Sequence, residues 1–252
     1  MTVLATMPKY EAYKNSGIEW LGNIPSHWGI NKVFHQFYAK KGIRSAQLTK
    51  EYCGLNKGTF PVYSGQTENK GVMGRIDSYE FVFSDSGCLF STTVGAKAMT
   101  VNYLIGKFSL SQNCMIIIGR YPNTVNMKFC YYLFQPMFAY FRNQIPDHMQ
   151  ASFRMEDLYQ YHFPTPLYKE QTAIANFLDK KTIQIDEAIA IKKKQIELLK
   201  ARKQIIIQKA VTQGLDPNVP MRDSGVDWIG EIPEHWKVKR AKYLFNEIDE
   251  RS

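Results

Sequence analysis

The chain has 252 residues, of which 44% are hydrophobic, and a formal net charge of +9. This composition is typical of a folded soluble protein, and no apolar run in the sequence approaches the roughly 18 residues that a membrane span needs, which argues against a membrane protein. The excess of basic residues favours a polyanionic partner such as nucleic acid, although a merely basic surface would give the same charge.

The first residues and the cysteines bear on the compartment. Residues 1–9 carry no readable secretory signal, so we predict a cytoplasmic protein. The cysteines form no C-x-x-C pair and have no nearby His at metal-ligand spacing. We therefore predict no bound metal and four buried free thiols: Cys53, Cys88, Cys114 and Cys130.

A thirteen-residue element near the N-terminus recurs 208 residues later. Residues 16–28 read SGIEWLGNIPSHW and residues 224–236 read SGVDWIGEIPEHW, with eight identical positions. The period is about the size of a domain, so the chain holds one full unit and the opening of a second. We predict that His27 and His235 are buried hydrogen-bonding residues and not metal ligands. The tryptophans are predicted to pack against a long helix: Trp20, Trp28, Trp228 and Trp236.

Between the two copies, residues 50–125 read as short apolar segments broken by glycines and polar turns. Strands are predicted at residues 59–63, 79–83, 88–92, 99–104 and 114–118, which together indicate a mixed, β-rich sheet. Residues 126–143 carry aromatic side chains at helical spacing, so a helix is expected there, kinked or divided by Pro136. Pro164 and Pro166 then close the globular part.

From Lys169 to about Gln213 the pattern is helical throughout, and Gly214 and Pro217 supply a stop. Apolar residues follow a 4-3 spacing, which is typical of a coiled coil and requires a partner helix. A helix of this length spans about 65 Å at about 1.5 Å per residue. The predicted apolar seam consists of Leu178, Ile185, Ile189, Ile196, Leu199, Ile206 and Ala210, with Thr182, Lys192 and Lys203 at the remaining positions.

The tandem S-G-x-x-W-x-G-x-I-P-x-H-W elements resemble the opening of each half of type I restriction-modification specificity subunits. A second signature agrees, because residues 155–158 (MEDL), 163–166 (FPTP) and 170–179 (EQTAIANFLD) are similar to that family's passage from recognition domain into spacer helix. These elements bracket nearly the whole chain. The domain between them, residues 30–150, is the part that the family varies.

The resemblance implies an α/β (α+β) fold in which a mixed-sheet target recognition domain is followed by a long helix that forms an antiparallel coiled coil with a partner helix. We expect a recognition domain at residues 1–166 with its repeat element at 14–37, a spacer helix at 167–214, and a linker with a truncated second repeat at 215–252. The family usually has two recognition domains and two helices. This chain has one of each, so a homodimer through the helix is expected.

The resemblance also implies the partners. They are double-stranded DNA, methyltransferase subunits and, through them, restriction subunits, all directed to a bipartite site. The chain itself is expected to be non-catalytic and without a cofactor, since S-adenosylmethionine, Mg²⁺ and ATP would be bound by the partner subunits. In agreement, the sequence has no methyltransferase cofactor loop with an Asn/Asp-Pro-Pro-aromatic motif, and no acidic pair at nuclease spacing. The alternative class is a coiled-coil scaffold that binds protein and not nucleic acid.

Sequence-specific binding requires cations for phosphates and bidentate polar side chains for base edges. Three polar stretches supply them, at residues 63–71, 91–97 and 150–154. The candidate DNA-contacting residues are Tyr63, Ser64, Gln66, Asn69, Lys70, Thr92, Thr93, Lys97, Gln150, Ser152 and Arg154.

The first and third stretches also have a purely structural interpretation. The first would serve equally as an ordinary hairpin loop. In the second, hydroxyls and backbone amides around Gly95 would form a phosphate-binding nest beside Lys97. In the third, Gln150 suits adenine and Arg154 suits guanine, but Arg154 would equally form a structural ion pair. The basic run at 192–194, 200, 202 and 203 is either a solvated face or a contact for phosphate or an acidic partner.

Overall fold

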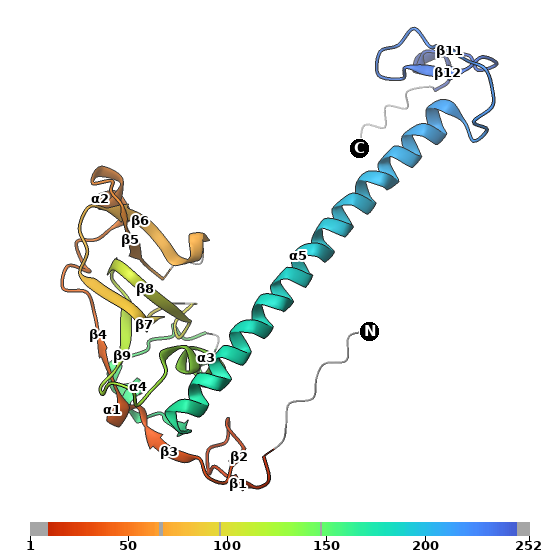
Figure 1. The fold of residues 1–252 in the computed structure, drawn as a ribbon. Coiled ribbons are helices and arrows are strands. Elements are labelled where there is room, and N and C mark those ends of the chain that lie inside the picture. The colour runs from red at the N-terminus through yellow and green to blue at the C-terminus, as the bar shows by residue number, and fades with distance from the viewer. Residues whose placement is uncertain (1–9, 66–67, 96, 147, 246–252) are drawn as a thin grey trace. The chain divides into compact units, whose positions relative to one another are not determined.

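The computed structural model describes residues 10–65, 68–95, 97–146 and 148–245 (Figure 1). The chain divides into two compact units, residues 1–181 and 182–252. The helix α5 (Tyr168–Gln213) is continuous over 46 residues and contributes to both units. It agrees with the single long helix predicted from residues 169 to 213.

The first unit is built on a six-stranded sheet in the order β4-β9-β7-β8-β5-β6. Neighbouring strands pair antiparallel, except that β5 and β8 are parallel. The predicted mixed, β-rich sheet is therefore confirmed. Its strands are β4 (Phe37–Lys40), β5 (Phe60–Tyr63), β6 (Val72–Ile76), β7 (Phe81–Thr92), β8 (Val101–Leu110) and β9 (Cys114–Gly119).

The segments predicted as separate strands at 79–83 and 88–92 belong to one long strand, β7. Its pairing with β8 shifts register between Phe83 and Cys88. Two glycines with positive φ stand at this irregularity, Gly87 on β7 and Gly106 on β8. Glycine adopts this backbone conformation without a Cβ penalty, which lets the strand continue through a bulge.

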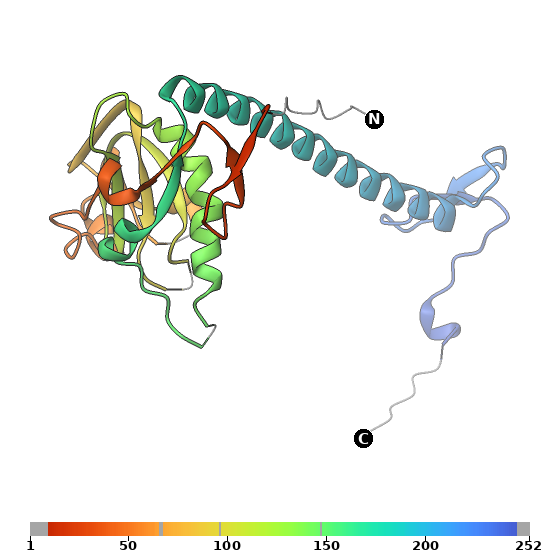
Figure 2. The ribbon, with the colours of Figure 1, turned by 90° about the horizontal axis from the view of Figure 1, so that it is seen from below.

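The helix α3 (Met127–Asn143) covers one face of the sheet over β7 and β8 (Figure 2). The Asn126 side chain caps it by accepting from the backbone N–H groups of Lys128 and Phe129. Pro136 lies inside the helix and does not divide it. Phe129, Phe134 and Phe138 bury their rings in the main core, together with Leu89 of β7 and Phe37 of β4.

The remaining short elements are β1 (Tyr13–Asn15), β2 (Asn23–Pro25), β3 (Gly29–Lys32), α1 (Val33–Gln36), α2 (Lys50–Leu55), α4 (Met155–Gln160), β10 (His162–Thr165), β11 (Met221–Asp223) and β12 (Glu231–Pro233). A 3-10 turn covers Glu68–Gly71 and another Ala241–Tyr243. Strand β10 pairs with β3, which ties the end of the recognition segment to its beginning. All four cysteines are free and buried, as predicted.

The two copies of the repeated element fold alike. Hairpins β1–β2 and β11–β12 pair in the same register, Tyr13 opposite Pro25 and Met221 opposite Pro233. In both copies the loop is closed by a backbone hydrogen bond of 3.0 Å between equivalent residues, Ser16 to Gly22 and Ser224 to Gly230. The internal repeat is therefore a structural repeat as well.

The tryptophans of the repeats occupy four different settings. Trp28 donates to Glu170 of α5 at 3.0 Å, and Trp236 lies beside Gly214 at the end of the helix. Trp20 packs against the main core, whereas Trp228 is 77% exposed, so the prediction that all four pack on the helix is wrong for Trp228.

The two histidines of the repeats are not buried, contrary to prediction. His27 has half of its side chain exposed and pairs with Glu170 at 3.1 Å, and His235 is exposed with its ring against Trp236. Each lies at the edge of its hairpin, where the small repeat element supplies too little cover to bury an imidazole.

The first turns of α5 are fixed to the recognition segment. The buried Gln171 side chain donates to the carbonyls of Thr124 and Pro166 at 3.2 and 2.9 Å, and accepts from the Asn126 N–H at 2.8 Å. Asp179 accepts from the Tyr132 hydroxyl at 2.7 Å and from the Lys128 ammonium. These bonds join the beginnings of α3 and α5.

Within the second unit, residues 182–209 of α5 are exposed throughout. The predicted seam residues Ile185, Ile189, Ile196, Leu199 and Ile206 are among them. The apolar surface is wider than the predicted 4-3 seam, because it also includes Ile183, Ile191, Leu198, Ile205, Ile207 and Val211. The basic run between 192 and 203 is solvent-exposed too.

Candidate nucleic-acid interface

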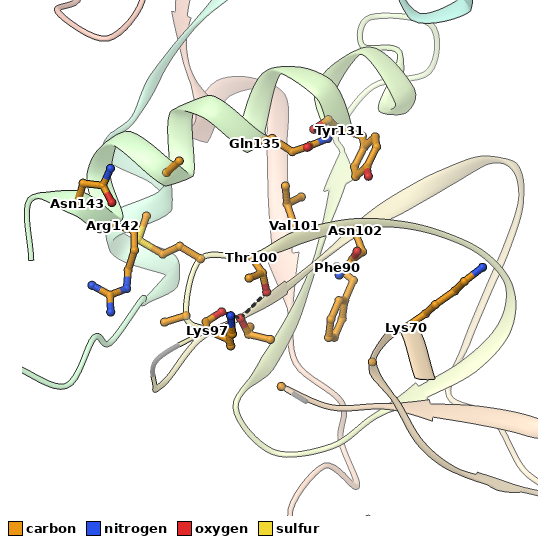
Figure 3. Close-up of a pocket in the computed structure, with 16 residues that line it drawn as sticks. Lys70, Phe90, Lys97, Thr100, Val101, Asn102, Tyr131, Gln135, Arg142 and Asn143 are labelled. Carbon is orange, nitrogen blue, oxygen red and sulfur yellow. Dashed lines mark hydrogen bonds between the residues drawn. The ribbon is translucent and has the colours of Figure 1, made fainter. Parts of the chain in front are cut away.

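An open pocket of about 580 Å³ lies between Gly65 with the turn Glu68–Gly71, the start of β8 and the face of α3 that the core leaves free (Figure 3). Three parts of the chain that are far apart in sequence meet there. The polar side chains that line it are Lys70, Lys97, Asn102, Gln135, Arg142 and Asn143.

Among the described residues, the pocket lining contains three cations and no Asp or Glu. Lys70 and Lys97 come from loops, and Arg142 comes from the last turn of α3. The Nε atom of Arg142 is buried without a hydrogen-bond partner among the described residues. Cations that face one open pocket without a carboxylate raise the local potential and attract an anion.

Some residues of the first two predicted DNA-contacting stretches, residues 63–71 and 91–97, lie close together in the structure. Lys70, Thr92 and Lys97 line the same pocket, and Tyr63 and Ser64 lie at the end of β5, with the Ser64 side chain buried. Gln66 lies outside the described residues. Asn69 lines a neighbouring pocket.

Some backbone N–H groups of the predicted phosphate-binding nest at residues 91–97 are already used inside the protein. The backbone N–H groups of Thr93, Gly95 and Ala98 donate to the carbonyls of Asn113, Ala151 and Gly95 at 2.8 to 3.0 Å. These amides have no proton left for a phosphate.

The threonine hydroxyls of this stretch are also poorly placed for DNA. Thr92 and Thr93 are buried, and the Thr92 hydroxyl donates to the Lys97 carbonyl and contacts the Thr100 hydroxyl at 2.8 Å. The two threonines support the turn from inside, and of this stretch Lys97 is left as the exposed charged candidate.

The third stretch lies against the second. Val94 and Ser152 form an isolated β-bridge, and the Phe153 N–H donates to the Thr93 carbonyl at 2.7 Å. Gln150, Ser152 and Arg154 are exposed, and Ser152 and Arg154 line a small adjoining pocket. Among the described residues the Arg154 guanidinium forms no ion pair.

Sequence reasoning missed the contribution of α3. Tyr131, Gln135, Ala139 and Asn143 line the pocket at intervals of four residues, which places them on one face of the helix. The signal was present in the sequence, since Gln135 and Asn143 are amides in a helix whose other residues, apart from Lys128 and Arg142, are aromatic or apolar. The prediction followed the buried aromatic face and did not weigh the opposite one.

In the described part of the chain, no group of three or more His, Cys, Asp or Glu side chains is placed to hold a metal ion. The helices within the same residues are too polar or too short to cross a membrane.

Residues 39–201 match the family of type I restriction modification DNA specificity domains. A putative type I specificity subunit of Mycoplasma pneumoniae, S.MpnORF285P, is 36% identical over 110 residues, which are 42% of this chain and 35% of that protein. The MjaVIII specificity subunit of Methanocaldococcus jannaschii is 22% identical over 87% of this chain and 49% of its own length. This chain therefore spans at most half the length of these two relatives.

Two solved structures share the fold. A chain from work on complex assembly and conformational transition of the type I R-M system aligns with a TM-score of 0.60 and 16% identity, covering 81% of this chain and 49% of that one. The S subunit from M. genitalium aligns with a TM-score of 0.52 and 22% identity, covering 67% and 43%. The family match extends over more than half of the sequence, and the mixed sheet with its long helix agrees with it. The chain belongs to the type I restriction-modification DNA specificity domain family.

Proposed function

We propose that this chain is a sequence-specific DNA-binding specificity subunit that directs methyltransferase and restriction subunits to a bipartite site. The observation that carries the proposal is the pocket that Lys70, Lys97 and Arg142 line, inside the segment that matches the family, with no Asp or Glu among its described lining residues. The cations suit phosphate oxygens, and the neighbouring amides of Asn102, Gln135 and Asn143 suit base edges.

We propose a separate role for each of three consecutive segments of the chain. Residues 1–166 form the recognition domain, residues 167–214 the spacer helix, and residues 215–252 a linker and the opening of a second repeat. The recognition domain would read one half-site. Family membership supports a non-catalytic role, with S-adenosylmethionine, Mg²⁺ and ATP bound by the partner subunits in the cytoplasm.

The second half-site requires a second recognition domain. A homodimer in which two spacer helices pair antiparallel would supply it, and the exposed apolar residues of α5 support such pairing. A helix of 46 residues is about 69 Å long at about 1.5 Å per residue, close to two turns of duplex at about 34 Å each. The expected target is therefore a palindromic, interrupted sequence.

The test combines binding and methylation. The full chain is mixed with its methyltransferase subunit and a labelled duplex, and band shifts are recorded across a salt series. We expect binding that weakens steeply with salt and, in cells that express both subunits, methylation of one interrupted sequence. A chain that binds DNA weakly at every salt concentration and leaves no methylated sequence would contradict the proposal and favour a protein-binding scaffold.

A further inference from the structure

A second open pocket, of about 720 Å³, lies beside the turn Glu68–Gly71, between α2 and β6. Its lining includes Lys50 from the start of α2, Lys57 from the loop that follows, and Arg75 from β6. As in the first pocket, the described lining residues include no Asp or Glu. Asn69 of the turn is the other polar side chain at its edge.

The turn that separates the two pockets has a strained backbone. Asn69 and Lys70 both have positive φ, 49° and 56°, and neither is a glycine. Such a conformation costs on the order of 1 kcal/mol per residue and persists only where the surrounding structure holds it. Here the Ser64 N–H donates to the Gly71 carbonyl at 2.9 Å and closes the loop between β5 and β6.

The turn directs its two consecutive residues, Asn69 and Lys70, to different pockets. Asn69 lines the pocket on the α2 side, and Lys70 lines the pocket on the α3 side. Each of the two pockets is also lined by its own set of basic residues. The turn therefore lies between two surfaces that carry basic side chains, one on the α2 side and one on the α3 side.

The groove of a duplex has the matching arrangement. It is bounded on both sides by phosphate backbones, about 12 Å apart in the major groove and about 6 Å apart in the minor groove, with base edges on its floor. A protein loop that enters a groove therefore meets phosphates on both flanks. Cations on each side of the loop hold it in place, and its tip contacts bases.

We propose that Lys50, Lys57 and Arg75 form a second phosphate-contact surface, so that the turn with Asn69 and Lys70 enters a DNA groove between two backbone contacts. This inference rests on the proposed DNA-binding function. It assigns DNA contacts to α2 and β6, which the sequence did not single out.

The three cations are available for this role. Lys50 and Lys57 are exposed and form no ion pair with any described carboxylate. Arg75 is held in position because its Nη1 donates to the Thr59 carbonyl at 2.8 Å, which leaves its other N–H groups for a ligand. An arginine fixed at one end suits a phosphate oxygen better than a freely moving one.

The test measures salt dependence. The full chain carrying Lys50→Gln with Lys57→Gln is titrated with a labelled random-sequence duplex of about 40 base pairs, which is several helical turns. The matched control, Lys14→Gln with Lys169→Gln, removes the same charge from exposed positions of the first unit outside both pockets. Circular dichroism verifies that both proteins fold.

Each phosphate contact contributes about 0.9 to the slope of log Kobs against log salt. We expect the double variant to lose about 1.8 from the magnitude of that slope, and the control pair to lose much less. Equal slopes for the two double variants would overturn the second surface while leaving the proposed function intact. A wild-type chain whose DNA binding does not respond to salt would overturn the proposed function itself, and this inference with it.

A second variant tests the turn separately. Asn69→Gly removes the amide and keeps a residue that adopts positive φ easily. In cells that also express the methyltransferase subunit, we expect it to broaden the set of methylated sequences while the salt slope stays at the wild-type value. An unchanged set of sequences would show that the Asn69 amide does not contact bases.

Discussion

Glu170 joins the N-terminal repeat to the start of α5. Its carboxylate accepts from the Trp28 indole at 3.0 Å and from the Tyr10 hydroxyl, and pairs with His27 at 3.1 Å. Replacing Glu170 with Gln removes the charge and leaves some of these donors unpaired, so we expect a loss of about 1–3 kcal/mol in the free energy of unfolding.

Urea denaturation of the full chain measures this loss. Glu187→Gln is the matched control, because Glu187 is an exposed residue of the same helix, and it should change stability by less than about 0.5 kcal/mol. Two variants of equal stability would show that the carboxylate does not hold the hairpin on the helix.

The same carboxylate gives the fold a pH dependence. Burial by itself would raise the pKa of Glu170, but the hydrogen bonds from Tyr10, Trp28 and His27 outweigh it and the pKa is lowered. A carboxylate with a lowered pKa stabilises the fold fully above its unfolded value of about 4.3, and the contribution is lost as the pH falls through the folded value. The stability difference between wild type and Glu170→Gln should therefore be full at about pH 7 and small near pH 3. A difference that grows on acidification would contradict this assignment.

Substitution of Lys97 tests whether the first pocket contacts phosphate. The residue is exposed and lines the pocket, where no described lining residue carries a carboxylate. We expect Lys97→Gln to weaken binding about equally for all DNA sequences and to reduce the salt slope by about 0.9, as for one phosphate contact. Lys14→Gln is the control. A changed sequence preference with an unchanged slope would instead assign Lys97 to base reading.

At the scale of the element, the irregularity within β7 and β8 depends on glycine. A Cβ at Gly87 would lie 2.4 Å from the Tyr103 ring, whereas at Gly106 nothing lies within 4 Å. Both residues have positive φ, so alanine at either site costs about 1–2 kcal/mol in backbone strain. Gly87→Ala should be more destabilising than Gly106→Ala because the ring must move as well. Equal urea midpoints for the two variants would mean that the Tyr103 ring moves aside without a cost in stability.

The helix α3 shows how one element serves both the core and the site. Its aromatic face fills the main core, and its opposite face presents Gln135 and Asn143 to the pocket. The core face is recognisable from the aromatic periodicity alone. The role of the other face becomes visible only when the turn Glu68–Gly71 and the start of β8 are placed opposite to it.

For the whole molecule, the decisive question is what covers the apolar surface of α5. Ile189→Glu with Ile196→Glu introduces charges into the seam, and we expect this change to convert a dimer into a monomer in sedimentation equilibrium at tens of micromolar. Ile43→Glu with Leu55→Glu is the control, because both residues are exposed in the first unit, away from the seam. A wild-type chain that is monomeric under these conditions would contradict the homodimer.

Features with a local cause could be predicted from the sequence. The repeated element, the continuous helix of α5 and the positions of four of the six sheet strands, β5, β7, β8 and β9, follow from residue identity, helical periodicity and glycine or proline punctuation. The family resemblance likewise rested on contiguous residues, and the match over 39–201 confirms it. Lys70 and Lys97 could be recognised because they stand in polar, glycine-containing loops.

Other features were decided by contacts between residues far apart in the chain. The pairing of β5 with β8 and the packing of α3 on the sheet bring Lys70, Lys97 and Arg142 to one pocket. The same contacts bury Thr92 and engage the backbone N–H groups of Thr93 and Gly95, which are then not free for the predicted nest. Spacing in the sequence cannot reveal these outcomes, because burial and the choice of hydrogen-bond partner are set by strand order and helix packing and not by neighbours in the chain.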